Sequence, residues 1–123
     1  MLGRYLSVAM LAALALTRSA CAQDTGDGRR VFQTNCSICH TVQPGRNLVG
    51  PTLFGVVNRH SGRVPGFHYS TANLQSGLTW DPATLDRYLT APQHVVPGTF
   101  MTFPGLPDSA KRSDLIAYLE TLH

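Results

Sequence analysis

At positions 36 to 40 the sequence reads Cys36-Ser37-Ile38-Cys39-His40. Two cysteines that are separated by two residues and followed directly by a histidine are the attachment pattern of a c-type haem. Both thiols can add to the two vinyl groups of one haem only if they lie one helical turn apart on one face, which this spacing provides. The next imidazole can then point at the iron. The stretch therefore predicts one covalently bound haem c per chain, attached through two thioethers.

Three other interpretations of the two cysteines compete with haem attachment: a redox dithiol, half of a zinc site and a structural disulfide. A thioredoxin-like dithiol belongs near a strand–helix–strand pattern, which this sequence lacks, and it leaves His40 unexplained. A structural zinc site usually needs four cysteine or histidine ligands in paired spacing. The other histidines form no such pair: His60, His68, His94 and His123. None of the three interpretations fits well.

Met101 is the candidate for a second axial ligand of the iron. The other methionines, Met1 and Met10, lie in an N-terminal leader, so we expect Met101 to be the only one in the mature chain. It ends the stretch PGTFM at residues 97–101, where proline and glycine force an extended or turning path. A lone methionine can also fill a core, but the haem pattern favours a ligand.

Residues 1–22 are typical of a secretory signal peptide. A short basic start, residues 1–4, precedes an apolar stretch over 5–16 and a small-residue cleavage site at 20–22. The apolar stretch is too short for a membrane-spanning helix, which needs about 20 residues. We therefore expect cleavage before Gln23 and export.

An alternative is that Cys21 becomes a lipidated first residue, because Ser-Ala-Cys resembles the end of a bacterial lipoprotein signal. Arg18 stands where that signal requires an aliphatic residue. Export together with haem attachment indicates the periplasm, whereas lipidation would anchor the protein to a membrane surface.

The remaining residues 23–123 suffice for one compact domain and are too few for two. The sequence is 43% hydrophobic with a mean hydropathy of −0.03, so it can form a core. Its formal charge of +3 includes Arg4 and Arg18; without them eight basic and seven acidic residues leave +1. A near-neutral domain lacks the clustered positive charge that binds nucleic acid, which we exclude as a partner.

Hydrophobic spacing and capping residues predict a small all-α domain. The expected helices cover residues 26–40, with the haem cysteines at the end, and 70–75; one begins at Pro82 and ends at Ala91-Pro92, and the last begins near Asp108. Residues 41–69 are dense in glycine and proline, which break helices and strands. We expect them to wrap around the haem.

Taken together, the chain resembles the class I c-type cytochromes of the mitochondrial cytochrome c and bacterial cytochrome c2 type. The resemblance covers essentially all of residues 23–123. The matching stretches are CSICHTV at 36–42, Gly50-Pro51, Pro65-Gly66-Phe67, Trp80, Pro97-Gly98-Thr99 with Met101, and DLIAYL at 114–119. The resemblance implies the small cytochrome c fold, in which the N- and C-terminal helices cross and loops surround the haem.

The resemblance also implies roles for individual residues. His40 and Met101 would be the axial ligands of the iron, and the carbonyl of Pro51 would accept the other ring N–H of His40. Arg59, Tyr69 and Trp80 match positions that hydrogen-bond the haem propionates in the resembled family. The polar network on the methionine side comprises Asn73, Tyr88 and Thr99. Phe103 would lie beside the haem edge.

Each of these residues also has an ordinary structural interpretation. Tyr88 and Trp80 could be amphipathic core residues, and Arg59 could be a solvated loop charge. A glycine within a helix, Gly28, costs about 1 kcal/mol relative to alanine. In the resembled family this position is the helix crossing, which we expect to set Gly28 and Phe32 against the last helix at Leu115 and Tyr118.

The ligand set implies a soluble periplasmic one-electron carrier between respiratory or dehydrogenase partners, not an enzyme. Histidine and methionine together leave no open position on the iron, and methionine raises the reduction potential. If Met101 were displaced, a haem peroxidase or a gas sensor would be the alternative, with His60, His68 or His94 as replacement ligands. A third interpretation is that the protein is a subunit or anchored module of a dehydrogenase or oxidase complex.

Two departures from the resembled family concern partners and a loop. Relatives often ring the haem edge with lysines, but Lys111 is the only lysine here, and Gln93, His94 and Phe100 stand at ring positions. We therefore expect the haem edge to be weakly charged and partly apolar, and redox donor and acceptor proteins to dock there. We expect the protein itself to be a monomer. Asn47 stands where many relatives carry a histidine that ties loops together, which leaves the stability of that loop open.

Overall fold

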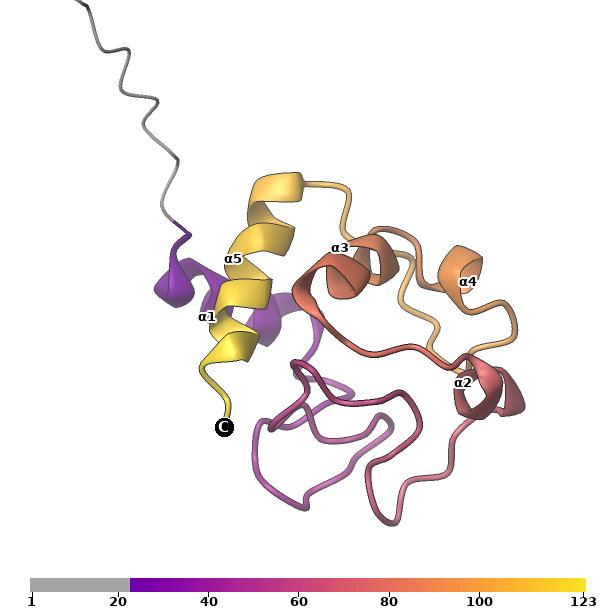
Figure 1. Ribbon diagram of the computed structural model, residues 1–123. Coiled ribbons are helices and arrows are strands. Elements are labelled where there is room, and N and C mark those ends of the chain that lie inside the picture. The colour runs from indigo at the N-terminus through magenta and orange to yellow at the C-terminus, as the bar shows by residue number, and fades with distance from the viewer. Residues whose placement is uncertain (1–22) are drawn as a thin grey trace, which may run out of the picture.

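The fold is helical, and long loops connect its N-terminal and C-terminal helices. The computed structural model describes residues 23–123, with α1 Thr25–Asn35, α2 Thr71–Gln75, α3 Pro82–Thr90, α4 Pro92–Val95 and α5 Ser109–Glu120 (Figure 1). Over this range there is no strand, and one isolated bridge pairs His60 with Thr79. The all-α prediction is confirmed. The predicted signal peptide and the alternative lipid anchor at Cys21 lie outside the described residues.

Side-chain caps explain where four of the helices begin. Each cap accepts a hydrogen bond from a main-chain N–H of the first turn, which has no partner inside the helix. The caps are Asp24, Ser70, Asp81 and Asp108. No described helix is long and apolar enough to span a bilayer.

The first helix is shorter than predicted. It ends at Asn35, and the N–H groups of Cys36 and Ser37 both donate to the carbonyl of Phe32. The haem-attachment stretch then forms a separate turn, in which the N–H groups of Cys39 and His40 donate to the carbonyl of Cys36 at 3.1 and 2.9 Å. The prediction that the helix reaches residue 40 is wrong, because the N–H of Ser37 bonds five residues back to Phe32 and so interrupts the series of four-residue helical hydrogen bonds.

The short helix α4 was also missed. Proline after Ala91 stops α3 as expected, but Pro92 then begins a new helix, because its fixed φ suits a first helical position. The carbonyl of Pro92 accepts the N–H of Val96 at 2.9 Å.

The two terminal helices cross closely at Gly28. A Cβ at this position would overlap the main-chain carbonyl of Asp114 and come within 2.8 Å of the Cβ of Tyr118. The rings of Phe32 and Tyr118 lie 5.9 Å apart between centroids, and Leu115 is buried. The predicted crossing is confirmed, and its closest contact is main chain rather than side chain.

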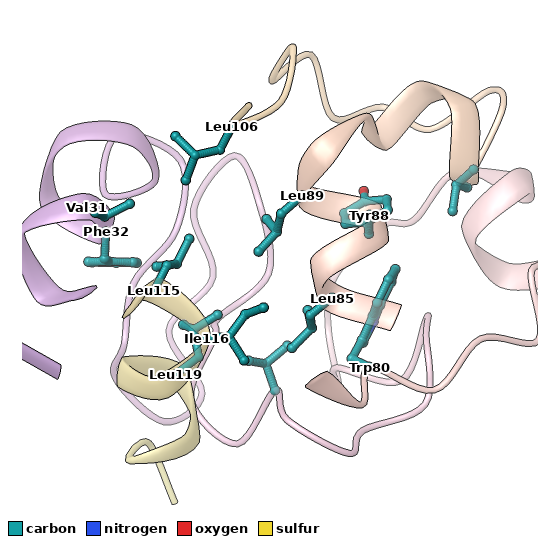
Figure 2. Close-up of a cluster of buried hydrophobic side chains, with 12 residues drawn as sticks. Val31, Phe32, Trp80, Leu85, Tyr88, Leu89, Leu106, Leu115, Ile116 and Leu119 are labelled. Carbon is teal, nitrogen blue, oxygen red and sulfur yellow. The ribbon is translucent and has the colours of Figure 1, made fainter. Parts of the chain in front are cut away.

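The core extends from this crossing to the middle helices. Figure 2 shows side chains of α1 and α5 meeting around Leu115, while Trp80 and Tyr88 lie next to each other before and on α3. The ring centroids of Trp80 and Tyr88 are 4.6 Å apart. Leu106 joins the cluster from the segment that precedes α5.

Residues 41–70 contain no helix and are held by hydrogen bonds to distant residues. Main-chain bonds join Asn58 and Arg59 to Trp80, each at 2.9 Å. The side chain of Asn47 accepts from the N–H of Thr52 at 3.0 Å and donates to the carbonyl of Pro65 at 3.2 Å. Asn47 therefore joins the two loops by hydrogen bonds, as the histidine at this position does in many relatives.

Candidate haem-binding site

One cavity collects the residues that the sequence singled out. It lies between the loops of residues 39–59, helix α3 and the segment 99–103, with part of the helical core as its floor. All twelve predicted site residues line it: Cys36, Cys39, His40, Pro51, Arg59, Tyr69, Asn73, Trp80, Tyr88, Thr99, Met101 and Phe103. Most of its other walls are apolar, including Leu53, Val56, Leu85 and Leu89.

The two cysteines face this cavity as thiols that form no disulfide. Burial, with a smaller contribution from Cys39, raises the pKa of the Cys36 thiol to about 11. Redox-active dithiols need the opposite shift, towards a thiolate near neutral pH. The redox interpretation is therefore unfavourable, and the described residues contain no cluster of histidine, cysteine and carboxylate groups that would complete a zinc site.

His40 is oriented by the loop opposite its turn. Its Nδ1 lies 2.7 Å from the carbonyl oxygen of Pro51. Because a carbonyl only accepts, Nδ1 must carry the hydrogen, and the lone pair of the neutral ring lies on Nε2. Burial lowers the pKa of His40, which the bond to Pro51 partly opposes. The ring is thus a neutral ligand with one nitrogen free for a metal.

Gly50 is a site residue to which sequence analysis assigned no role. A Cβ there would overlap the His40 ring and lie 2.6 Å from Nδ1. Any larger residue would push the imidazole away from its place. Gly50 precedes the residue whose carbonyl holds the ring, and the pair Gly50-Pro51 could have suggested this close approach.

A second polar group surrounds the sulfur of Met101. The hydroxyl of Tyr88 donates to Sδ at 3.4 Å. The hydroxyl of Thr99 accepts from the main-chain N–H of Met101 at 3.2 Å and from the side-chain amide of Asn73 at 3.3 Å. Burial raises the pKa of Tyr88, so its hydroxyl keeps the proton that it donates. Asn73, Thr99, Met101 and Tyr88 thus form one connected hydrogen-bond network, in which Thr99 contacts the main chain of Met101 and Tyr88 contacts its sulfur.

Arg59 is half-buried and fixed, not a solvated loop charge. Its guanidinium donates to the carbonyls of Phe54 and Thr52, each at 3.0 Å. Burial lowers its pKa, and Tyr69 acts in the opposite direction. Within residues 23–123 the ion pairs are Arg30–Asp27 and Arg112–Asp86. The charge on Arg59 therefore faces the cavity without a carboxylate from this part of the chain.

Tyr69 and Trp80 complete this side of the cavity. The hydroxyl oxygen of Tyr69 accepts the N–H of Val64 at 3.1 Å, and its ring meets Phe67 edge to face at 4.8 Å. Phe67 also lines the cavity. Sequence analysis assigned Phe67 no individual role, because an aromatic residue in a glycine-rich loop carries no periodicity that indicates its direction.

The alternative histidine ligands lie elsewhere. None of His60, His68 and His94 lines the cavity. The Nδ1 of His60 is 2.9 Å from the hydroxyl oxygen of Thr79, and the ring of His68 stacks on Phe100 at 6.1 Å. Met101, in contrast, lines the cavity and carries a thioether sulfur that can bind iron.

These residues fit a haem c. Two unpaired thiols and a neutral imidazole lie on adjoining turns of the chain, and a thioether sulfur enters from another segment of the same cavity. The guanidinium of Arg59, which has no carboxylate partner within residues 23–123, suits the propionate carboxylates, and apolar walls suit the macrocycle. Each chemical feature of the cofactor has a counterpart among the lining groups.

Comparison with known proteins agrees with this geometry. The cytochrome c family model matches residues 26–123. Cytochrome c2 of Rhodopila globiformis is 55% identical over 104 residues, which are 85% of this chain and 98% of that protein. Cytochrome c2 of Rhodoblastus acidophilus is 56% identical over 99 residues, or 80% of this chain and 92% of that protein.

A solved structure has the same fold. Cytochrome cH from Methylobacterium extorquens is 45% identical, and the match covers 80% of this chain and 98% of that one with a TM-score of 0.76. The chain therefore belongs to the cytochrome c family and is a class I c-type cytochrome of the c2 type, an electron-transfer protein rather than an enzyme, which carries covalently attached haem c.

Proposed function

We propose that this cytochrome is a periplasmic one-electron carrier whose iron is bound by His40 and Met101. Bound haem supplies reversible one-electron chemistry between Fe(II) and Fe(III), and the chain binds it, orients the two ligands and excludes water. In this proposal residues 1–22 are the signal peptide that directs export, and residues 23–123 are the cytochrome c domain. The leader carries the basic start, apolar stretch and small-residue cleavage site of an export signal.

The hydrogen bond between His40 and Pro51 is the observation that carries this assignment. It engages Nδ1 at 2.7 Å and leaves Nε2 with the lone pair that a metal needs. The Tyr88 hydroxyl holds the sulfur of Met101 in the same cavity. Binding by His40 and Met101 would leave no position on the iron for oxygen or peroxide, and a thioether ligand would favour the reduced state.

The remaining lining residues bind the rest of the cofactor in this proposal. Cys36 and Cys39 form the two thioethers. Arg59, Tyr69 and Trp80 hold the propionates, and the guanidinium of Arg59 gains the carboxylate that residues 23–123 do not provide. Asn73 and Thr99 support Tyr88 and Met101, and Phe103 lies beside the exposed edge.

We assign the docking surface to the apolar rim of the cavity. Val49 and Phe100 line the cavity and are 79% and 63% exposed, and Ile38, between the two cysteines, is 85% exposed. None of them is charged. Donor and acceptor redox proteins would dock on this rim through apolar contact, one at a time, with the cytochrome as a monomer.

Absorbance spectra of the oxidised and reduced protein test the ligand set. We expect haem to survive acid-acetone extraction, and a weak long-wavelength band of sulfur bound to ferric haem to be present and to disappear in Met101→Ala. Covalent haem without that band would contradict Met101 as a ligand and would favour an open or histidine-filled position.

The mass of the protein recovered from a periplasmic extract tests the export assignment. A polypeptide that begins at Gln23 and carries one haem is expected. A mass that includes a diacylglycerol on Cys21, with the protein in the membrane fraction, would contradict ordinary cleavage and support the lipid anchor.

A further inference from the structure

The segment that carries Met101 has little main-chain support of its own. Within the described chain, the last main-chain hydrogen bond before it is from Thr99 N–H to Val96 at 3.0 Å, and the next is from Leu106 N–H to Leu89 at 2.7 Å. Residues 100–105, called the Met101 segment below, make no main-chain hydrogen bond to each other or to any other main-chain group of residues 23–123. Side chains must therefore hold this segment in place.

One side chain serves two carbonyls of the Met101 segment. The Nε2 of Gln93 donates to the carbonyl oxygen of Met101 at 2.8 Å and to that of Phe103 at 3.1 Å. An amide nitrogen has two hydrogens, one for each carbonyl. The flipped amide would bring Oε1 against both carbonyl oxygens, which repel it, so the geometry defines the orientation.

Helix α4 gives Gln93 a firm base. The residue before it, Pro92, is almost fully buried, and Val96 at the end of the turn is 2% exposed. The short helix is thus anchored by its buried side, while Gln93 extends over the Met101 segment from outside. The chain that directly follows the Met101 segment is held separately, because Arg112 donates to the carbonyls of Leu106 and Pro107 at 2.8 and 2.9 Å.

We propose that Gln93 is a positioning residue that clamps the Met101 segment over the cavity and so keeps the sulfur of Met101 in place. The inference rests on the proposed ligation by Met101. Tyr88 and Thr99 hold the sulfur and the N–H of that residue, whereas Gln93 holds its carbonyl and that of Phe103. Without the amide, both carbonyls would turn to water and the segment would open more often.

Imidazole, which competes with the sulfur for ferric iron, is the probe for this opening. Two hydrogen bonds are lost in Gln93→Ala and water replaces them in part, so this variant is expected to bind imidazole roughly 3- to 10-fold more tightly than wild type. Gln93→Leu keeps the bulk but has no N–H and should behave like Gln93→Ala. Gln93→Lys supplies N–H donors on a long side chain and should restore most of the wild-type affinity.

Amide hydrogen exchange of the holoprotein measures opening of the segment without an added iron ligand. Among the amides of residues 100–105, the N–H of Met101 is bonded to the hydroxyl of Thr99. Exchange of the Met101 amide is expected to accelerate by a similar factor in Gln93→Ala, and exchange in α1 and α5 to stay unchanged. Gln75→Ala is the matched control, because Gln75 is an exposed glutamine at the end of another short helix, and no hydrogen bond from its side chain is present. It should change neither readout.

The possible failures are distinguishable. Unchanged exchange and imidazole affinity in Gln93→Ala would overturn the clamp while leaving Met101 as ligand. Faster exchange throughout the protein would also overturn it, because it would show general destabilisation. If wild type lacks the sulfur band, ligation by Met101 is wrong, and exchange of the Met101 amide alone then decides whether Gln93 holds the segment.

Discussion

At the scale of single residues, His40 and Met101 are each held by one neighbour through a defined atom. Pro51 holds a ring nitrogen that points away from the proposed metal, whereas Tyr88 donates directly to the sulfur. The two contacts have different electronic consequences. A donor on the sulfur withdraws electron density from the ligand atom itself and makes it a weaker donor to ferric iron.

Tyr88→Phe is therefore expected to lower the reduction potential. Loss of the O–H removes density withdrawal from the sulfur of Met101, which stabilises Fe(III) relative to Fe(II). A differential hydrogen-bond contribution of about 0.5–1 kcal/mol corresponds to roughly 20–40 mV for one electron. Potentiometric titration measures the change, and Tyr118→Phe, outside the cavity, is the matched control. A potential equal to that of wild type would contradict this role of the hydroxyl.

The residues that the sequence could and could not identify differ in a physical way. The attachment stretch and Met101 are recognisable because their chemistry depends on residue type. The pair Gly50-Pro51 suggests a close approach of the main chain, but that the His40 ring is the group approached depends on two segments meeting in space. In the same way, the replacement of a loop-tying histidine by Asn47 could be judged only once its two hydrogen bonds were visible.

At the scale of elements, helix starts were predictable and helix ends were less so. Asp81 and Pro82 mark the start of α3 through a side-chain acceptor and a fixed φ, both of which are local properties. The end of α1 depends instead on a change of hydrogen bonding at Cys36 that leaves the hydrophobic spacing unchanged. Pro92 both stops one helix and starts another, and only the first property was used in the prediction.

The crossing of α1 and α5 gives a prediction about stability. In Gly28→Val the new side chain would overlap the carbonyl of Asp114, which belongs to helix main chain and cannot rotate away. The helices must separate, at a cost of about 1–3 kcal/mol or more. The melting temperature should fall by about 4–8 °C for each kcal/mol.

Gly26→Ala is the control for this substitution. Gly26 lies in the same helix, but its added Cβ would meet only the flexible side chain of Asp24, at 3.1 Å. Because alanine is favoured over glycine in a helix, its melting temperature should equal or exceed that of wild type, as measured by thermal unfolding of the holoprotein. If Gly28→Val melts like Gly26→Ala, the close crossing does not explain the glycine.

At the scale of the whole molecule, the helices alone do not make a site. Residues 41–70 form one wall of the cavity and the segment 99–103 another. Hydrogen bonds to distant residues hold the first, and side chains of Asn73, Tyr88 and Gln93 hold the second. The sequence predicted that these loops surround a cofactor, because their glycine and proline content excludes regular structure. It could not predict which loop contacts which, because those contacts are long-range.

The charge distribution of the whole molecule leads to a prediction about association. The rim residues Ile38, Val49 and Phe100 are uncharged and exposed, and residues 23–123 carry a formal charge of +1, from eight basic and seven acidic residues. Salt screens encounters that charge steers, but it has little effect on apolar contact. Electron self-exchange between ferrous and ferric copies should therefore change by less than about twofold between roughly 10 and 500 mM salt.

A charge placed on the rim should create the missing salt dependence. In Val49→Lys two like charges meet at each encounter, so self-exchange should be slower than wild type at low salt and recover as salt is added. Ala110→Lys adds the same charge at an exposed position of α5 that does not line the cavity, and it should behave like wild type. NMR line broadening in mixtures of the two oxidation states measures the rate. If both variants show the same salt dependence, encounters are governed by net charge, and the apolar rim is not the surface through which electrons pass.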